Sequence, residues 1–169
     1  MTDDALDLER AIVSEITHSE HEVLFDLWGL QDRPGVAATI FEAATEEDVN
    51  VDTILQNAAH GAAALSFSVP IADAPAARRA LDRARGTIGA FEHAEISDLG
   101  KVSIVGAGLR SHPNVVVRMF RALADEQINI RVISMSPITV QCLVDRSEVE
   151  RAVRALHDTF PLDADRPSA

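Results

Sequence analysis

The sequence contains one stretch twice, and this repeat limits the possible folds more than any other feature. Residues 30–54 (LQDRPGVAATIFEAATEEDVNVDTI) align without a gap with residues 109–133 (LRSHPNVVVRMFRALADEQINIRVI). The residues that recur in register are Leu30 and Leu109, Pro34 and Pro113, Val36 and Val115, Phe41 and Phe120, Ala43 and Ala122, Glu47 and Glu126, Asn50 and Asn129, and Ile54 and Ile133. A repeat this long, with apolar and turn residues in register, indicates two copies of one unit built from a strand, a turn, a helix and a strand.

Hydrophobic periodicity predicts the elements of the first copy. The spacing of Val36, Ile40 and Ala44 predicts a helix that starts at Pro34, because a first helical position needs no backbone N–H. The strand before this helix contains Trp28 and is expected to be well buried. The expected elements are strands over 22–30, 49–56, 64–69 and 90–96, a helix from 34 to 48, and a helix over 73–85 that Gly86 ends. The order β-α-β-β-α-β is ferredoxin-like, with two helices on one face of an antiparallel sheet.

The second copy lacks its last strand. Its expected elements are strands over 101–106, 128–135 and 138–144, a helix after Pro113 that buries Val116, Met119, Phe120 and Leu123, and a last helix over 149–160. Only a polar, proline-rich tail follows Phe160. However, an extra strand is predicted over 11–17, before a polar turn over 18–21. We therefore predict that this N-terminal strand completes the second sheet.

The predicted fold is α+β, with two ferredoxin-like βαββαβ domains, the first inserted into the second. The first domain is expected over residues 20–98, the second over 9–18 together with 99–161, and a tail over 162–169. A chain of 169 residues is long enough for two small domains that share a core. The 47% apolar content agrees with a packed core.

Charge and cysteine content argue against several classes of function. The net charge of -12 disfavours nucleic acids and anionic membranes as partners, because both attract a positive surface. A single cysteine, Cys142, excludes a disulfide within the chain and favours a cytoplasmic location. The polar N-terminus argues against secretion, and no apolar run reaches the ~20 residues of a membrane span. Cys142 lies in a predicted strand between Val140 and Val144, so we expect a buried, inert thiol.

No group of residues matches a catalytic, metal or nucleotide site. Gly106-Ala107-Gly108 follows a predicted strand but lacks the third glycine of a dinucleotide motif. Among the six histidines only His18 and His21 are near neighbours, and we expect both on the surface. We therefore expect no cofactor, no metal and no enzyme activity in this chain.

The turn before the first repeat helix is the best candidate for a binding site. The N-terminus of a helix presents free N–H groups and positive potential, which suit a carboxylate. Gly35 leaves the backbone open to a ligand, and Asp32 can pair with an ammonium group. Together they form a clamp for a zwitterionic amino acid. In the alternative interpretation, Asp32 only caps its helix and Gly35 only relieves crowding.

Several motifs resemble the C-terminal regulatory region of aspartate kinases, which contains a pair of ACT domains. The motifs of the first unit are QDRPG at 31–35, VNVD at 49–52, Gln56-Asn57 and SFSVP at 66–70. Those of the second unit are KVSIVG at 101–106, RSHP at 110–113, INI at 128–130, Ile133-Ser134 and RALH at 154–157. The resemblance covers residues 12–160, and the catalytic kinase domain of the family is absent from it.

The resemblance implies a non-catalytic regulatory subunit of aspartate kinase. Its partners are then a second copy, joined through the ACT sheets, and a catalytic kinase subunit. Threonine or lysine, the effectors of feedback inhibition in amino-acid biosynthesis, binds in clefts between ACT units of this family. Carried over by position, the effector site comprises Asp32, Arg33, Gly35, Val36, Gln56 and Asn57 of the first unit and Asn129, Ile130 and Ser134 of the second.

Three departures from the family pattern keep a second hypothesis open. Ala63-Ala64 replaces a polar Thr-Asp pair, Ser136-Pro137 interrupts the usual STSEI motif, and Asn114 replaces the glycine of the second helix turn. Each change removes a polar group or backbone access that an amino-acid effector uses. The alternative is therefore a scaffold or dimerisation subunit whose effector specificity is changed or lost.

Overall fold

The chain forms two compact units, one inserted into the other. The computed structural model describes residues 13–59, 62–160 and 162. Among the described residues, the inner unit spans 21–99, and the outer unit combines residues 13–20 with residues from 100 to 160. The strands are β1 (Val13–Gln31), β2 (Ile54–Ala59), β3 (Ala62–Pro70), β4 (Glu92–Gly106), β5 (Val132–Met135) and β6 (Thr139–Asp145). The α-helices are α2 (Val36–Glu46), α3 (Ala74–Ile88), α4 (Pro113–Asp125) and α5 (Val149–Thr159).

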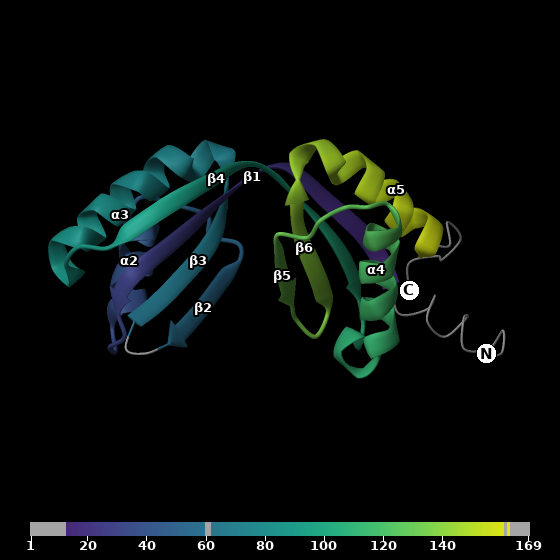
Figure 1. The fold of residues 1–169 in the computed structure, drawn as a ribbon, viewed down its shortest axis with the longest axis horizontal. Helices are drawn as coiled ribbons and strands as arrows, with labels where there is room; N and C mark the ends of the chain where they lie inside the picture. The colour runs from purple at the N-terminus through teal and green to yellow at the C-terminus, as the bar shows by residue number, and fades with distance from the viewer. Residues whose placement is uncertain (1–12, 60–61, 161, 163–169) are drawn as a thin grey trace. The chain divides into compact units, whose positions relative to one another are not determined.

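The inner unit is a four-stranded sheet with two helices on one face. Its strands lie in the order β2-β3-β1-β4, and α2 and α3 cover the same side (Figure 1). β3 pairs antiparallel with β1, which places Phe25 opposite Phe67 and Leu27 opposite Leu65. β2 pairs antiparallel with the other edge of β3, which places Gln56 opposite Leu65. This is the predicted βαββαβ arrangement.

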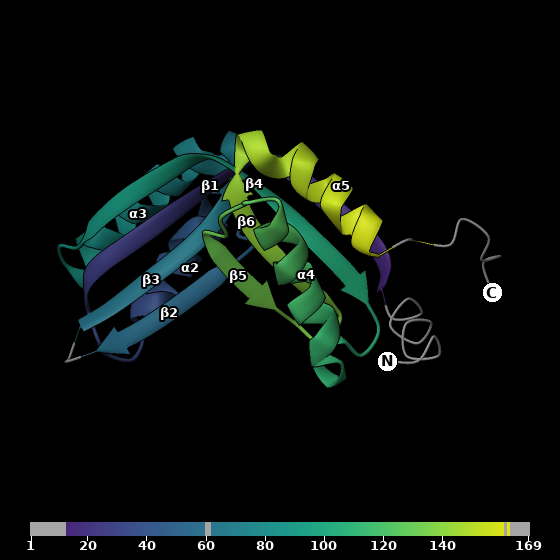
Figure 2. The ribbon, with the colours of Figure 1, turned by 45° about the vertical axis from the view of Figure 1, so that its right-hand side comes forward.

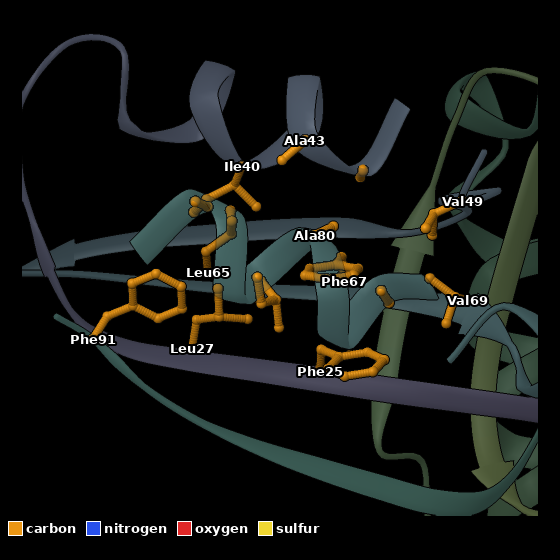
Figure 3. Packing of buried hydrophobic residues seen from close by; sticks show 14 of the residues in the cluster. Phe25, Leu27, Ile40, Ala43, Val49, Leu65, Phe67, Val69, Ala80 and Phe91 are labelled. Carbon is orange, nitrogen blue, oxygen red and sulfur yellow. The ribbon is translucent and has the colours of Figure 1, made fainter. Parts of the chain in front are cut away.

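Alternation along β3 builds the core of the inner unit. Leu65, Phe67 and Val69 are all buried beneath the helices, as their spacing predicts (Figure 3). Phe67 stacks on Phe25 at 5.3 Å between ring centroids, and Phe41 of α2 meets it edge-on at 5.8 Å. The aromatic cluster therefore fixes the middle of α2 over the sheet.

The outer unit repeats this architecture with its last strand supplied from the N-terminus. Its strands lie in the order β1-β4-β6-β5, and α4 and α5 cover one face (Figure 2). Val13 of β1 is buried in the same cluster as Val102 of β4 and Val140 of β6. The first unit is thus inserted into the second, which confirms the fold predicted from the sequence.

Both β1 and β4 run without a break from one unit into the other. The polar turn predicted over 18–21 is therefore wrong, because these residues continue β1. Trp28 is also not buried, since 46% of its surface is exposed. The pairing of β1 with β3 shifts register between Leu27 and Leu30, and Gly29 has a φ of 75°. Trp28 follows the buried Leu27 and therefore lies on the opposite face of β1, whereas the bulge returns Leu30 to the core side.

Several predicted ends of elements are displaced. Gly86 lies inside α3, which ends at Ile88 because Gly89 takes a φ of 92°. The strands predicted from residues 49 and 128 begin at Ile54 and Val132. In α4 the fully buried residues are Val115, Met119 and Leu123, whereas Val116 and Phe120 are only partly buried. The apolar face of α4 is thus rotated slightly from the predicted one.

Cys142 has the environment that its spacing predicts. It lies in β6 with no exposed surface, in the core of the outer unit. Burial raises the pKa of its thiol to about 12, because the apolar surroundings disfavour the thiolate. A thiol that stays protonated at neutral pH is a poor nucleophile and a poor metal ligand.

Candidate functional site

The turn between β1 and α2 depends on the backbone of Gly35. Its φ of 95° lies in the left-handed region that favours glycine, and its carbonyl accepts the N–H of Thr39 at 2.9 Å. A Cβ at Gly35 would meet nothing within 4 Å, so relief of crowding does not explain this glycine. No side chain caps α2, so the interpretation of Asp32 as a helix cap is also wrong. Pro34 precedes the helix, which begins at Val36 and not at Pro34.

A cavity of about 340 Å³ opens beside this turn. Its lining comes from the end of β1, the turn, the first residues of α2, and the facing parts of β2 and β3. The lining residues are Leu30, Gln31, Asp32, Arg33, Pro34, Gly35, Val36, Ala37, Gln56, Ala63 and Leu65. This volume is at the small end of the range for ligand pockets, about 300–1,000 Å³, and suits a small organic molecule.

The cavity has two chemically different parts, which we call the floor and the rim. The floor consists of the buried lining residues Leu30, Val36, Ala63 and Leu65. The rim consists of the exposed lining residues Gln31, Asp32, Arg33, Pro34, Gly35 and Gln56. Charged and amide groups are therefore confined to the mouth, and hydrocarbon side chains form the bottom.

The rim offers partners for both charges of a zwitterion. The Asp32 carboxylate can pair with an ammonium group, and the Arg33 guanidinium can pair with a carboxylate. The first intrahelical bond of α2 runs from the N–H of Thr39 to the carbonyl of Gly35, so the N–H groups of Val36 and Ala37 have no acceptor within the helix. Within the described residues, no group of His, Cys, Asp and Glu is arranged to hold a metal ion. The arrangement is suited to binding a small charged molecule.

Five of the nine predicted site residues line this cavity. They are Asp32, Arg33, Gly35, Val36 and Gln56. Asn57 lies in β2 opposite Ala64. The other three belong to the outer unit, where Asn129 is exposed, Ile130 packs against the core, and Ser134 of β5 lies opposite Gln141.

Sequence reasoning missed the floor of the cavity. Leu30 and Leu65 carry only the signal of core strand residues, which gives no indication that they also line a cavity. Ala63 stood out as a departure from the family pattern, and the structure places it on the floor beside Leu30, its partner in the β1–β3 ladder. The pairing of the strands brings these residues under the turn.

The equivalent turn of the outer unit has a different backbone. A 3-10 turn over 109–111 follows Gly108, and α4 begins at Pro113, the counterpart of Pro34. One ring nitrogen of His112 lies 3.0 Å from the carbonyl oxygen of Gly108. Asn114 lies inside the helix, whereas its counterpart Gly35 precedes α2. The two copies therefore share a fold but not the geometry of this turn.

The family is shown by comparison with known proteins. The ACT domain family model matches residues 28–84 and 102–160, one match in each unit. These matches cover more than half of the chain and coincide with the two ferredoxin-like halves of the fold. The chain belongs to the ACT domain family. In the part that the structure describes, no helix is long and apolar enough to cross a membrane.

Within that family the chain belongs with the regulatory regions of aspartate kinases. It is 33% identical to the regulatory subunit of aspartate kinase from Thermus thermophilus, with a TM-score of 0.81 over 88% of this chain and 99% of that one. It is 40% identical over 163 residues to an aspartate kinase of Pseudomonas fluorescens, which covers 96% of this chain and 40% of that protein. An aspartokinase of Mycolicibacterium smegmatis is 38% identical over 161 residues, or 94% of this chain and 38% of that protein. The chain spans about two fifths of the length of these curated relatives.

Proposed function

We propose that this chain is a non-catalytic regulatory part of an aspartate kinase, and that the cavity of its inner unit binds a free amino acid. The observation that carries the proposal is the cavity itself, with its charged rim at the Asp32–Gly35 turn. The membership in the aspartate kinase regulatory family supports the coupling to that enzyme activity. Threonine, lysine or both are the effectors that the resemblance implies.

The proposed mechanism is a shift between two arrangements of the assembly. An amino acid that binds one arrangement more tightly than the other raises the population of the first. The activity of the catalytic subunit changes with this population, because effector binding and activity depend on the same two arrangements. Binding in the mM to μM range corresponds to about 4–8 kcal/mol, which a few charged contacts and a small apolar floor supply.

The proposed partners are a second copy of this chain and a catalytic aspartate kinase subunit, in the cytoplasm. The edge strands of the two units support edge-to-edge pairing, because an unpaired edge is a template for another strand. β2 and β5 are the edges, and their equivalent residues Ile54 and Ile133 are both about half exposed. Met135 of β5 is exposed as well. The contributions of Asn57, Asn129, Ile130 and Ser134 to an effector site remain predictions from the resemblance.

Replacing Asp32 by asparagine tests the binding site. The change keeps the shape of the side chain but removes the charge that pairs with the ligand ammonium. A hydrogen bond to a charged group is worth about 1.5–3 kcal/mol, so we expect effector affinity to fall roughly 10- to 150-fold with no change in melting temperature. Calorimetric titration with amino acids measures this loss.

The matched control is Asp125→Asn, which removes the same charge at an exposed position of α4. It should leave affinity unchanged. Equal affinity in wild type and Asp32→Asn would show that Asp32 takes no part in binding.

The scaffold alternative is favoured by Ala63, because alanine at this floor position gives a ligand no polar contact. That alternative predicts that none of the twenty amino acids raises the melting temperature.

A further inference from the structure

The division of the cavity into floor and rim restricts how an amino acid can lie in it. The floor residues Leu30, Val36, Ala63 and Leu65 are between 2% and 7% exposed, and every one of their side chains is hydrocarbon. Ala63 and Leu65 lie in β3, which pairs with β1 on one side and with β2 on the other, so their backbone groups take part in the hydrogen bonding of the sheet. No floor side chain can therefore donate or accept a hydrogen bond from a ligand.

The charged end of an amino acid must lie at the rim. The ammonium and carboxylate groups are attached to one carbon, and only the rim side chains of Gln31, Asp32, Arg33 and Gln56 and the start of α2 offer them partners. The reverse orientation would put both charges against hydrocarbon, where an unpaired charge is very costly. The side chain of the ligand consequently points to the floor, and the floor determines which side chain fits.

We propose that this cavity selects amino acids with aliphatic side chains, such as valine, over threonine and lysine. The inference rests on the proposed function and departs from the effectors that the resemblance implies. Threonine has the shape of valine but carries a hydroxyl, which the floor leaves without a partner. Lysine has a second ammonium group at the far end of its side chain. Only one end of such a ligand can lie at the rim, so its second charge would lie against the apolar floor.

Burial of apolar surface supports the same preference. About 340 Å³ must hold both the backbone part of the amino acid and its side chain. A short branched hydrocarbon beneath the rim removes apolar surface of both the ligand and the floor from water. The transfer of one methylene group out of water is favourable by about 0.8 kcal/mol.

Competing titrations of the full chain with L-valine, L-threonine and L-lysine test the inference. Calorimetry should give a dissociation constant for valine about 10- to 100-fold lower than for threonine, because an apolar pocket rejects an added hydroxyl only to that extent. Lysine should bind more weakly than either.

Ala63→Ser places a hydroxyl on the floor and should narrow the preference for valine over threonine by about 5-fold, the value of one neutral hydrogen bond. Ala64→Ser is the matched control, because the neighbouring residue is exposed and its side chain lies on the opposite face of β3. It should leave the ratio unchanged. Threonine or lysine binding as tightly as valine would overturn the aliphatic preference while leaving the proposed function intact. Absence of binding by all twenty amino acids would overturn both.

Discussion

Gly100→Ala is expected to destabilise the chain by about 3 kcal/mol, although it adds a single methyl group. Gly100 lies in β4 where this strand, the end of the outer-unit part of β1, and the start of α5 meet. A Cβ there would clash with Cγ2 of Val149 and would lie 2.7 Å from the carbonyl oxygen of Ser19. Overpacking of this kind costs about 1–3 kcal/mol, and the backbone oxygen cannot move away as a side chain can. A thermal melt should show a fall of roughly 6–12 °C.

Gly86→Ala is the matched control for this prediction. Gly86 lies exposed in α3, and an added Cβ would meet nothing within 4 Å. Alanine is the better helix former by about 0.5–1 kcal/mol, so the same substitution should stabilise the chain there. Adding Val149→Ala to Gly100→Ala should recover part of the loss, because it removes one of the two clashes. Equal melting temperatures for Gly100→Ala and wild type would show that β4, β1 and α5 do not meet closely at this point.

Removal of residues 1–20 is expected to unfold the outer unit. The deletion takes away the β1 segment 13–20, which contributes buried Val13 and partly buried Ile16 to the outer core. Burial of two such side chains is worth roughly 3–5 kcal/mol, and the edge of β4 also loses its backbone partners. Hydrogen exchange should show protection lost in α4, α5, β5 and β6.

A peptide with the sequence of residues 13–20 provides the control. Added to the truncated chain, it should restore exchange protection in the outer unit, whereas a scrambled peptide should not. Trp28 is the only tryptophan and lies in the inner unit, so its fluorescence reports on that unit separately. A truncated chain with an unchanged melting temperature is incompatible with the insertion of one unit into the other.

The architecture could be predicted from the sequence because the repeat and a missing strand left few possible topologies. The ends of elements could not, since they depend on which residue takes an unusual backbone conformation. Gly86 and Gly89 look alike as helix stops, but only Gly89 adopts a positive φ. In the same way, the return of Leu30 to the core side depends on a bulge at Gly29 that no alternation of apolar residues reveals.

From the residues alone the site was predictable only where it is continuous in sequence, and Gln56 was added by the resemblance to a family. The rim residues Asp32, Arg33 and Gly35 lie in one turn, whose proline and glycine mark it as distinctive. The floor combines Leu30, Ala63 and Leu65, which become neighbours only through the register of β1 with β3. Register depends on the pairing of whole strands and on the bulge, so the apolar character of the floor required the structure.

The central claim is that an amino acid binds in the inner-unit cavity, and amide chemical shifts of the full chain test it most directly. On titration with valine, threonine and lysine, we expect concentration-dependent shifts at Asp32, Arg33, Gly35 and Val36, and at Gln56 and Ala63 across the cavity. The equivalent turn of the outer unit, residues 111–115, should change far less. Shifts confined to the outer-unit turn, or no shifts with any of the three amino acids, would contradict binding in the inner-unit cavity.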